Sequence, residues 1–147
     1  MTLKETLQSD LKDAMRAGDE LRKNTLRMAI SALKLAEIDK NSPLDESASL
    51  AIMQKEVKSR RESIADAQRA NRPDLVQAAE QEIAFLEHYL PKAFDATELE
   101  ALAQAAIQEI GATSLKEMGQ VMKVLMPRLQ GRATGDQASQ AVRKLLA

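Results

Sequence analysis

Apolar residues recur at steps of three and four along almost the whole chain, the spacing that places side chains on one face of an α-helix. Two such stripes flank the turn Asn71-Arg72-Pro73-Asp74, which predicts an αα-hairpin. No segment alternates apolar and polar residues as a strand does. The expected fold class is therefore all-α. The two stripes consist of Leu50, Met53, Val57, Ile64 and Ala67, and of Leu75, Ala79, Ile83, Leu86 and Leu90.

Capping signals divide the chain into helices and the helices into two groups. A Ser, Thr or Asp at a helix start, often with Glu or Gln three residues later, satisfies the first free N–H groups, and glycine commonly ends a helix. The segment Tyr89–Phe94 is a boundary, so we expect a four-helix domain at 1–94 and a three-helix domain at 95–147. The predicted starts are at Thr2 with Glu5, Asp19, Ser42-Pro43, Thr97 with Glu100, Ser114 with Glu117 and Thr134 with Gln137, and the predicted ends include Gly18 and Gly111.

The helix that follows Asp19 carries apolar residues on more than one side. They include Leu26, Ile30, Leu33 and Ile38. A helix that is apolar around most of its circumference is usually buried. We therefore expect this helix to lie largely inside the N-terminal domain.

The sequence lacks the residues that several classes of function need. The chain has no cysteine, which excludes thiolate metal sites and a cysteine nucleophile. Its single histidine, His88, has no ligand spacing around it, and no phosphate-binding or nucleophile motif occurs. We name no catalytic residue, no metal and no cofactor. No secretory signal and no apolar run of ~20 residues is visible, so a soluble cytoplasmic protein is the expectation.

The stretch Glu117–Gly135 contains two residues that helices tolerate poorly. Gly119 costs roughly 1 kcal/mol against alanine in a helix interior, so close approach by another backbone is the expected gain. Pro127 should kink or end the helix near Met126. The apolar stripe of this helix is predicted to be Leu115, Met118, Met122, Leu125 and Leu129, which leaves a small, basic opposite face.

Basic residues gather in the last part of the chain. From Lys116 onward six Lys and Arg residues face two acidic ones, giving 6 − 2 = +4. The loop around Gly131 and the first N–H groups of the last helix predict an anion site. The alternative is that these charges only solvate helices. The candidate RNA- or anion-binding residues are Lys116, Gly119, Lys123, Arg128, Gly131, Arg132 and Thr134.

A second basic group lies on the first helix of the predicted hairpin. Arg60 falls on the inward side of that helix, after Leu50, Met53 and Val57. One interpretation is an anion-facing ridge of Lys58, Arg60 and Arg61, extended by Arg69 and Arg72. The other is that Glu56 with Arg60, and Lys58 with Glu62, form i,i+4 ion pairs worth a few tenths of a kcal/mol each.

The C-terminal motifs resemble the tail shared by the GatB/YqeY family. Met118-Gly119-Gln120-Val121-Met122 matches its Gly-x-Val-Met helix, and Gly131-Arg132-Ala133 matches its Gly-x-Ala loop. The N-terminal segments Lys12–Asp19, Thr25–Arg27 and Lys55–Ile64, together with Tyr89-Leu90-Pro91, resemble the stand-alone YqeY branch. Where the family loop often has Asn-Pro, this chain has Thr134-Gly135, which keeps the helix cap but loses the rigid proline.

This resemblance implies a link to tRNA. In the large B subunit of tRNA-dependent amidotransferase the equivalent tail follows a body that amidates misacylated tRNA with glutamine as nitrogen donor, and the tail helps to engage the tRNA. That body has no counterpart here, so a carbon–nitrogen ligase activity rests on the shared tail alone. The leading hypothesis is a tRNA-binding or amidotransferase-like accessory protein. Replacing Lys123 and Arg132 together is expected to weaken tRNA binding and its salt dependence.

A rival hypothesis is a helical protein–protein adaptor with no RNA role. In that case Gly119 would admit a partner helix or the final helix of the same chain. The partner could belong to the translation or tRNA-charging machinery, and neither a membrane nor a metal is expected. A free-standing amidase or ligase ranks last.

Overall fold

The computed structural model describes residues 1–147 and is built entirely from helices. It confirms the all-α fold class. The chain folds into two compact units, Met1–Leu90 and Pro91–Ala147, so the division falls four residues before the predicted boundary at 94. None of the helices combines the length and apolar character that a membrane span requires.

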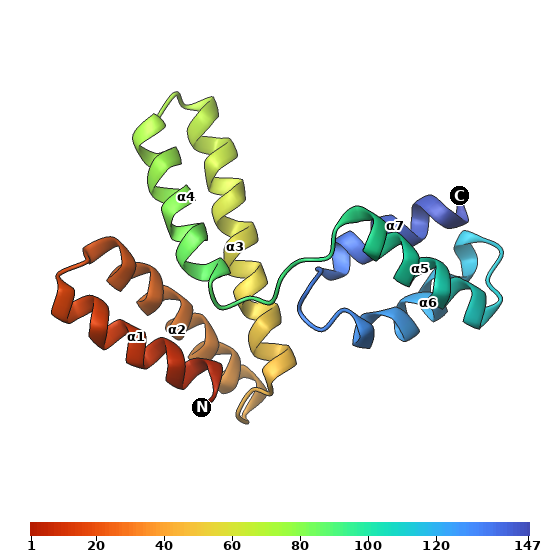
Figure 1. The fold of residues 1–147 in the computed structure, drawn as a ribbon, viewed down its shortest axis with the longest axis horizontal. Coiled ribbons are helices and arrows are strands. Elements are labelled where there is room, and N and C mark those ends of the chain that lie inside the picture. The colour runs from red at the N-terminus through yellow and green to blue at the C-terminus, as the bar shows by residue number, and fades with distance from the viewer. The chain divides into compact units, whose positions relative to one another are not determined.

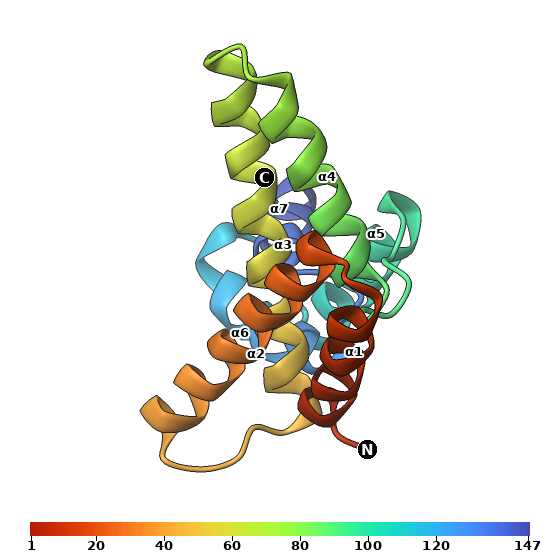
Figure 2. The same ribbon diagram turned by 90° about the vertical axis from the view of Figure 1, so that its left-hand side faces the viewer.

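Two helical hairpins form the N-terminal unit. Helix α1 (Leu3–Ala17) packs on α2 (Glu20–Lys40), and α3 (Glu46–Arg69) packs on α4 (Pro73–Glu87), as Figures 1 and 2 show. Helix α2 also contacts α3 and α4, and this joins the hairpins around one core. The predicted αα-hairpin is thus confirmed as α3–α4. The core is aliphatic and contains Leu7, Ala14, Leu26, Ala29, Ile30, Leu33, Met53, Val57, Ile83 and Leu86.

Three helices and two short 3₁₀ turns form the C-terminal unit. Helix α5 (Ala96–Ile110) contacts both α6 (Met118–Leu125) and α7 (Gly135–Leu146), and α6 also contacts α7. The 3₁₀ turns Leu115–Glu117 and Met126–Arg128 flank α6. The C-terminal unit has a small core, in which alanines let the helices approach closely. It contains Ala103, Ala106, Ile107, Val121, Leu125, Leu129, Ala133, Ala138 and Val142.

Most predicted helix ends are confirmed, and three starts are wrong. Capping boxes form at Thr2 and Thr134, Asp19 caps α2, and Gly18 and Gly111 end helices in the left-handed conformation. Helix α3 starts after Asp45, not at Ser42, because the Asp45 carboxylate accepts a hydrogen bond from the Ala48 N–H. Helix α5 starts after Asp95, which forms the capping box with Glu98.

The third incorrect start is at Ser114, whose side chain makes no capping hydrogen bond. Glu117 instead accepts hydrogen bonds from the N–H and hydroxyl of Thr113. The chain therefore enters α6 through a 3₁₀ turn, and Leu115, predicted to face the core, is exposed.

Helix α2 is less buried than its composition predicts. Leu26, Ala29, Ile30 and Leu33 face the core, but Ile38 on the opposite side is 73% exposed. The two hairpins cover one side of α2 and leave its other side open to solvent. The prediction that this helix lies largely inside the unit is therefore wrong for its outer side.

Tyr89, two residues after the end of α4, is hydrogen-bonded to α1. Its hydroxyl donates a hydrogen bond to the Asp10 carboxylate, and burial, reinforced by that hydrogen bond, raises the pKa of Tyr89 to about 12. Because the phenol titrates near 10 in an unfolded chain, the folded state holds its proton more tightly. The stabilisation is complete below pH 10 and is lost as the pH rises from about 10 to about 12.

We therefore expect the stability advantage of the wild-type protein over Tyr89→Phe to shrink across that alkaline range. Urea unfolding of both proteins, followed by circular dichroism, measures it. All other ionisable groups are common to both proteins, so the difference isolates Tyr89. An advantage that stays constant from pH 9 to about 12 would contradict the predicted linkage.

Candidate nucleic-acid interface

The outer face of α6 carries the predicted small, basic surface. Val121 and Leu125 are fully buried on the inner side of this helix, and Leu129 follows them into the core. Val121 was missing from the predicted stripe. Helix α6 ends at Leu125, and Pro127 lies in the following 3₁₀ turn, which confirms the predicted break. Lys116, Gly119 and Lys123 are consequently left exposed at steps of three and four residues.

Gly119 has open space beside it. A Cβ atom built at this position would meet no other atom within 4 Å, and the glycine is the second residue of α6, not an interior one. The interpretation that Gly119 admits the final helix of the same chain is therefore wrong. The glycine thus leaves the backbone uncovered at a position between two lysines.

The two lysines of this face have no acidic partner. No hydrogen bond or ion pair engages the side chain of Lys116 or Lys123. Glu117, the nearest acidic residue in sequence, directs its carboxylate to Thr113. We call Lys116, Gly119, Gln120 and Lys123 the α6 face. Its positive charge is uncompensated, so it can attract an anion.

Arg132, in the loop before α7, contacts three residues of the segment that leads into α5 and of α5 itself. Its Nε donates to the carbonyl of Lys92 at 2.8 Å, its guanidinium lies 4.0 Å from the Phe94 ring centroid, and an Nη lies 3.9 Å from a Glu98 carboxylate oxygen. The Arg132 carbonyl accepts from the Phe94 N–H at 2.8 Å. These contacts hold the segment leading into α5 against the loop.

The remaining predicted residues of the loop are also engaged. Arg128 is ion-paired with Glu109. Gly131 adopts a left-handed conformation, φ 75°, directly after Gln130 at φ 50°, so the glycine permits the tight reversal before α7.

The first turn of α7 offers fewer free N–H groups than predicted. The Thr134 hydroxyl accepts the Gln137 N–H, the Thr134 N–H donates to the Gln137 side chain, and Asp136 already places a carboxylate there. The start of α7 is therefore less suited to binding an anion than the sequence predicted. The candidate site shifts to the α6 face.

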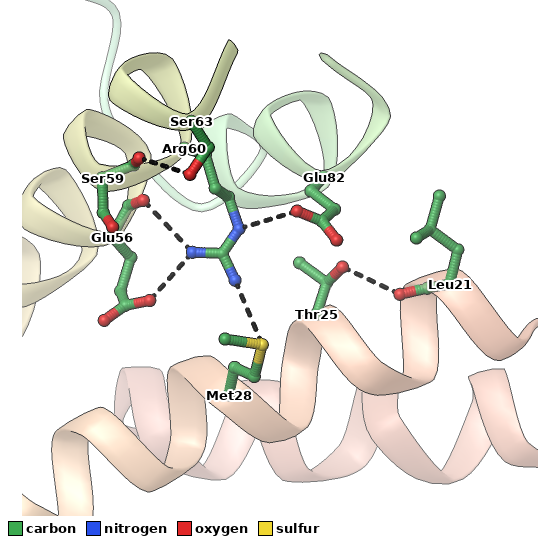
Figure 3. A network of polar contacts seen from close by, with 8 residues as sticks. All are labelled: Leu21, Thr25, Met28, Glu56, Ser59, Arg60, Ser63 and Glu82. Carbon is green, nitrogen blue, oxygen red and sulfur yellow. Dashed lines mark hydrogen bonds and ion pairs between the residues drawn. The ribbon is translucent and has the colours of Figure 1, made fainter. Parts of the chain in front are cut away.

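The second basic ridge is not a surface of free cations. Arg60 is only 5% exposed, with one Nη 2.8 Å from Glu56 of α3 and its Nε 3.3 Å from Glu82 of α4 (Figure 3). The Nε contact is an ion pair without hydrogen-bond alignment. The i,i+4 pair of Glu56 with Arg60 is confirmed, and the interpretation of Arg60 as anion-facing is wrong because the neighbouring hairpin covers it.

The other arginines of that ridge are paired as well. Arg61 lies 2.6 Å from Glu87, Arg69 lies 2.8 Å from Asp66, and Arg72 is hydrogen-bonded to Asp74. Lys58 is exposed on the same helix and has an interaction of its own. Arg72 lowers the pKa of Asp74 through their hydrogen bond, and Asp74 raises the pKa of Arg72 in the same way. Of these ion pairs, Arg61 with Glu87 links α3 to α4, whereas the pairs of Arg69 and Arg72 are local.

Sequence reasoning missed the second partner of Arg60. The inward position of Arg60 was visible from the apolar spacing, and a buried arginine requires an acidic neighbour. Glu82 was a candidate for this neighbour, because it lies one position before the buried Ile83 on the helix that pairs with α3. No group of three or more acidic or histidine side chains is placed to hold a metal ion. His88 is exposed, with its ring edge-on to Tyr89 at 5.3 Å.

Comparison with known proteins agrees with the motifs. The Yqey-like protein family model matches residues 4–146. The altered inheritance of mitochondria protein 41, a mitochondrial protein, is 40% identical in Eremothecium gossypii over 73% of this chain and 60% of that protein. The same protein of Lachancea thermotolerans is 40% identical over 68% of this chain and 54% of its own length. The Pyrenophora tritici-repentis protein is 29% identical over 86% and 71%, respectively.

The chain spans about half the length of the first curated relatives that it matches. The family model nevertheless covers nearly all of the chain, from α1 to the end of α7. The chain therefore belongs to the YqeY-like protein family.

Proposed function

We propose that this protein is a tRNA-binding accessory protein that holds the RNA backbone on the α6 face. The observation that carries the proposal is the pair of exposed, unpaired lysines, Lys116 and Lys123, on either side of the uncovered backbone at Gly119. Phosphate contacts from lysines supply most of the sequence-independent affinity for nucleic acid. The resemblance of the C-terminal motifs to amidotransferase tails favours tRNA as the RNA, and no catalytic step is part of the proposal.

Few aromatic side chains are available for base stacking. Phe94 lies under Arg132, and Phe85 and Tyr89 lie in the N-terminal unit. Recognition by shape and phosphate spacing, as proteins recognise folded or double-stranded RNA, fits this composition better than reading of single-stranded bases. The named relatives are mitochondrial, and a cytoplasmic location for this chain stays a prediction.

Replacing both Lys116 and Lys123 with alanine is expected to weaken tRNA binding and to reduce its salt dependence. Each lysine that contacts a phosphate should lower the slope of log K against log salt by about one unit. Fluorescence anisotropy with labelled tRNA across a salt series measures both effects. The matched control removes two exposed, unpaired lysines of the N-terminal unit, Lys12 and Lys55, and should change the slope little.

The Gly119→Ala variant tests whether the RNA backbone approaches the backbone of Gly119 closely or is only attracted by the charges of the two lysines. Because the added Cβ meets no atom, the variant should fold, and its gain in stability should be only part of the roughly 1 kcal/mol found in helix interiors, since Gly119 is the second residue of α6. Weaker tRNA binding by this stable variant would indicate close backbone approach. An affinity and salt slope that are the same in the double lysine variant and in wild type would rule out the α6 face as the RNA site and favour the adaptor hypothesis.

A further inference from the structure

The outer side of α2 presents an uncovered apolar seam. Met28 is 56% exposed, Leu35 60% and Ile38 73%. In Figure 2, no helix of the N-terminal unit lies outside the C-terminal half of α2, drawn in orange. This surface lies in a different unit from the α6 face and is independent of the function proposed above.

The spacing of the seam is that of a coiled-coil helix. Met28 and Leu35 are seven residues apart, and Ser31 and Ile38 are seven apart, so the four alternate as the a and d positions of a heptad. The small Ser31 lies between the two larger a residues and leaves a hole there. Such a narrow stripe fits side chains from one facing helix. A helix that lies on a membrane presents a broader apolar face, often with aromatic residues.

Charge beside the seam indicates what that facing helix carries. Arg27 and Lys34 directly precede Met28 and Leu35, at the g positions, and their exposed side chains have no hydrogen-bonded or ion-paired partner; the e positions hold Ala32 and Asp39. Flanking charges at the e and g positions choose the partner of a coiled-coil helix. A facing helix with carboxylates at these positions would neutralise both cations.

A second copy of α2 matches this surface less well. In an antiparallel pair, Arg27 of one copy would face Lys34 of the other, and like charges repel. In a parallel pair, Lys34 would face Asp39, but Arg27 would face Ala32 and stay unpaired. The charges therefore favour a different helix.

We propose that the α2 seam, defined as Arg27, Met28, Ser31, Lys34, Leu35 and Ile38, docks an acidic amphipathic helix of a partner protein. Met28 also contacts the α3–α4 hairpin: its sulfur lies 3.7 Å from an Nη of the buried Arg60 (Figure 3). That contact fixes one end of the seam to the α3–α4 hairpin. Leu35 and Ile38 are the free anchors.

A designed peptide tests the proposal with the full chain. The probe repeats heptads with leucine at a and d and glutamate at e and g, and its own charge repulsion keeps it from pairing with itself. The control peptide has lysine in place of glutamate. Isothermal titration calorimetry should show the acidic peptide binding at least about tenfold more tightly than the basic one.

Two sets of protein variants connect binding to the seam. Leu35→Gln with Ile38→Gln should weaken the acidic peptide by about tenfold or more, and Arg27→Ser with Lys34→Ser should weaken it most at low salt. Met15→Gln, at an exposed apolar position on α1, should leave binding unchanged. All of these positions are exposed, and circular dichroism verifies that each variant is folded.

The other possible occupants are outcomes of the same experiment. Failure of the wild-type chain to bind the acidic peptide, or equal binding by the Leu35→Gln/Ile38→Gln variant, overturns the proposal. A dimer seen by light scattering that is lost in this variant would identify a second copy as the occupant. Sedimentation with phosphatidylserine vesicles that is lost in this variant would identify a membrane.

Discussion

Replacing Arg60 with alanine is expected to destabilise the N-terminal unit by about 3 kcal/mol. The change removes a buried cation that contacts Glu56 and Glu82 from two different helices and leaves both carboxylates without their partner. The carboxylate side chains keep 22% and 26% exposure, so water relieves part of the loss and the lower end of the usual range applies. A change of this size should lower the melting temperature of the unit by roughly 12 °C or more.

Tyrosine fluorescence follows this unit selectively. Tyr89 is the single tyrosine, the chain has no tryptophan, and Tyr89 lies within Met1–Leu90. The matched control is Arg61→Ala, which breaks the exposed pair with Glu87 next to Arg60 and should cost at most about 1 kcal/mol.

A second variant separates the charge of Arg60 from its packing. Adding Glu82→Gln to Arg60→Ala should recover part of the stability, because it removes one of the unpaired charges. If Arg60→Ala proves no more harmful than Arg61→Ala, the buried ion pair is not what joins the helices.

Replacing Arg132 with alanine is expected to destabilise the C-terminal unit by about 2 kcal/mol. The variant loses a charged hydrogen bond to the Lys92 carbonyl and the stacking of the guanidinium on Phe94. The distant contact to Glu98 should add little, since the pair is partly exposed. Circular dichroism sees both units, so the part of the unfolding transition absent from tyrosine fluorescence reports the C-terminal one.

Two other variants define the role of Arg132. Arg132→Lys keeps the charge but lacks the planar guanidinium and its Nε donor, so it should restore less than half of the loss. Arg128→Ala, which removes the ion pair with Glu109 at the same end of α6, should stay within about 1 kcal/mol of wild type. Weaker tRNA binding by Arg132→Ala with unchanged stability would instead make this arginine an RNA ligand, as the sequence alone predicted.

The helices could be predicted because their determinants are local. The Thr2 and Thr134 capping boxes and the Gly18 and Gly111 ends depend on residues within one turn of each other. The missed starts show the limit of local reasoning. Asp95 and Thr97 both begin an acceptable capping box, and the hydrogen bond from the Phe94 N–H to the distant Arg132 carbonyl fixes the chain just before Asp95.

The candidate site was predicted only in part for a related reason. The spacing of Lys116, Gly119 and Lys123 predicted one helix face; all three are exposed, but Lys116 lies in the 3₁₀ turn that precedes α6. Whether an arginine is free depends on acidic residues far away in sequence. Arg128 is paired with Glu109, and Arg132 contacts Lys92 and Phe94, so neither could be assigned from spacing alone.

The sequence by itself determined the all-α class, the α3–α4 hairpin, the break at Pro127 and the inward position of Arg60, because helix periodicity and capping act over a few residues. Only the tertiary structure decided which side of α2 stays uncovered, which carboxylates neutralise Arg60, and that no helix of the chain fills the space beside Gly119. Burial and ion pairing depend on surfaces brought together from distant parts of the chain, and no local pattern specifies them.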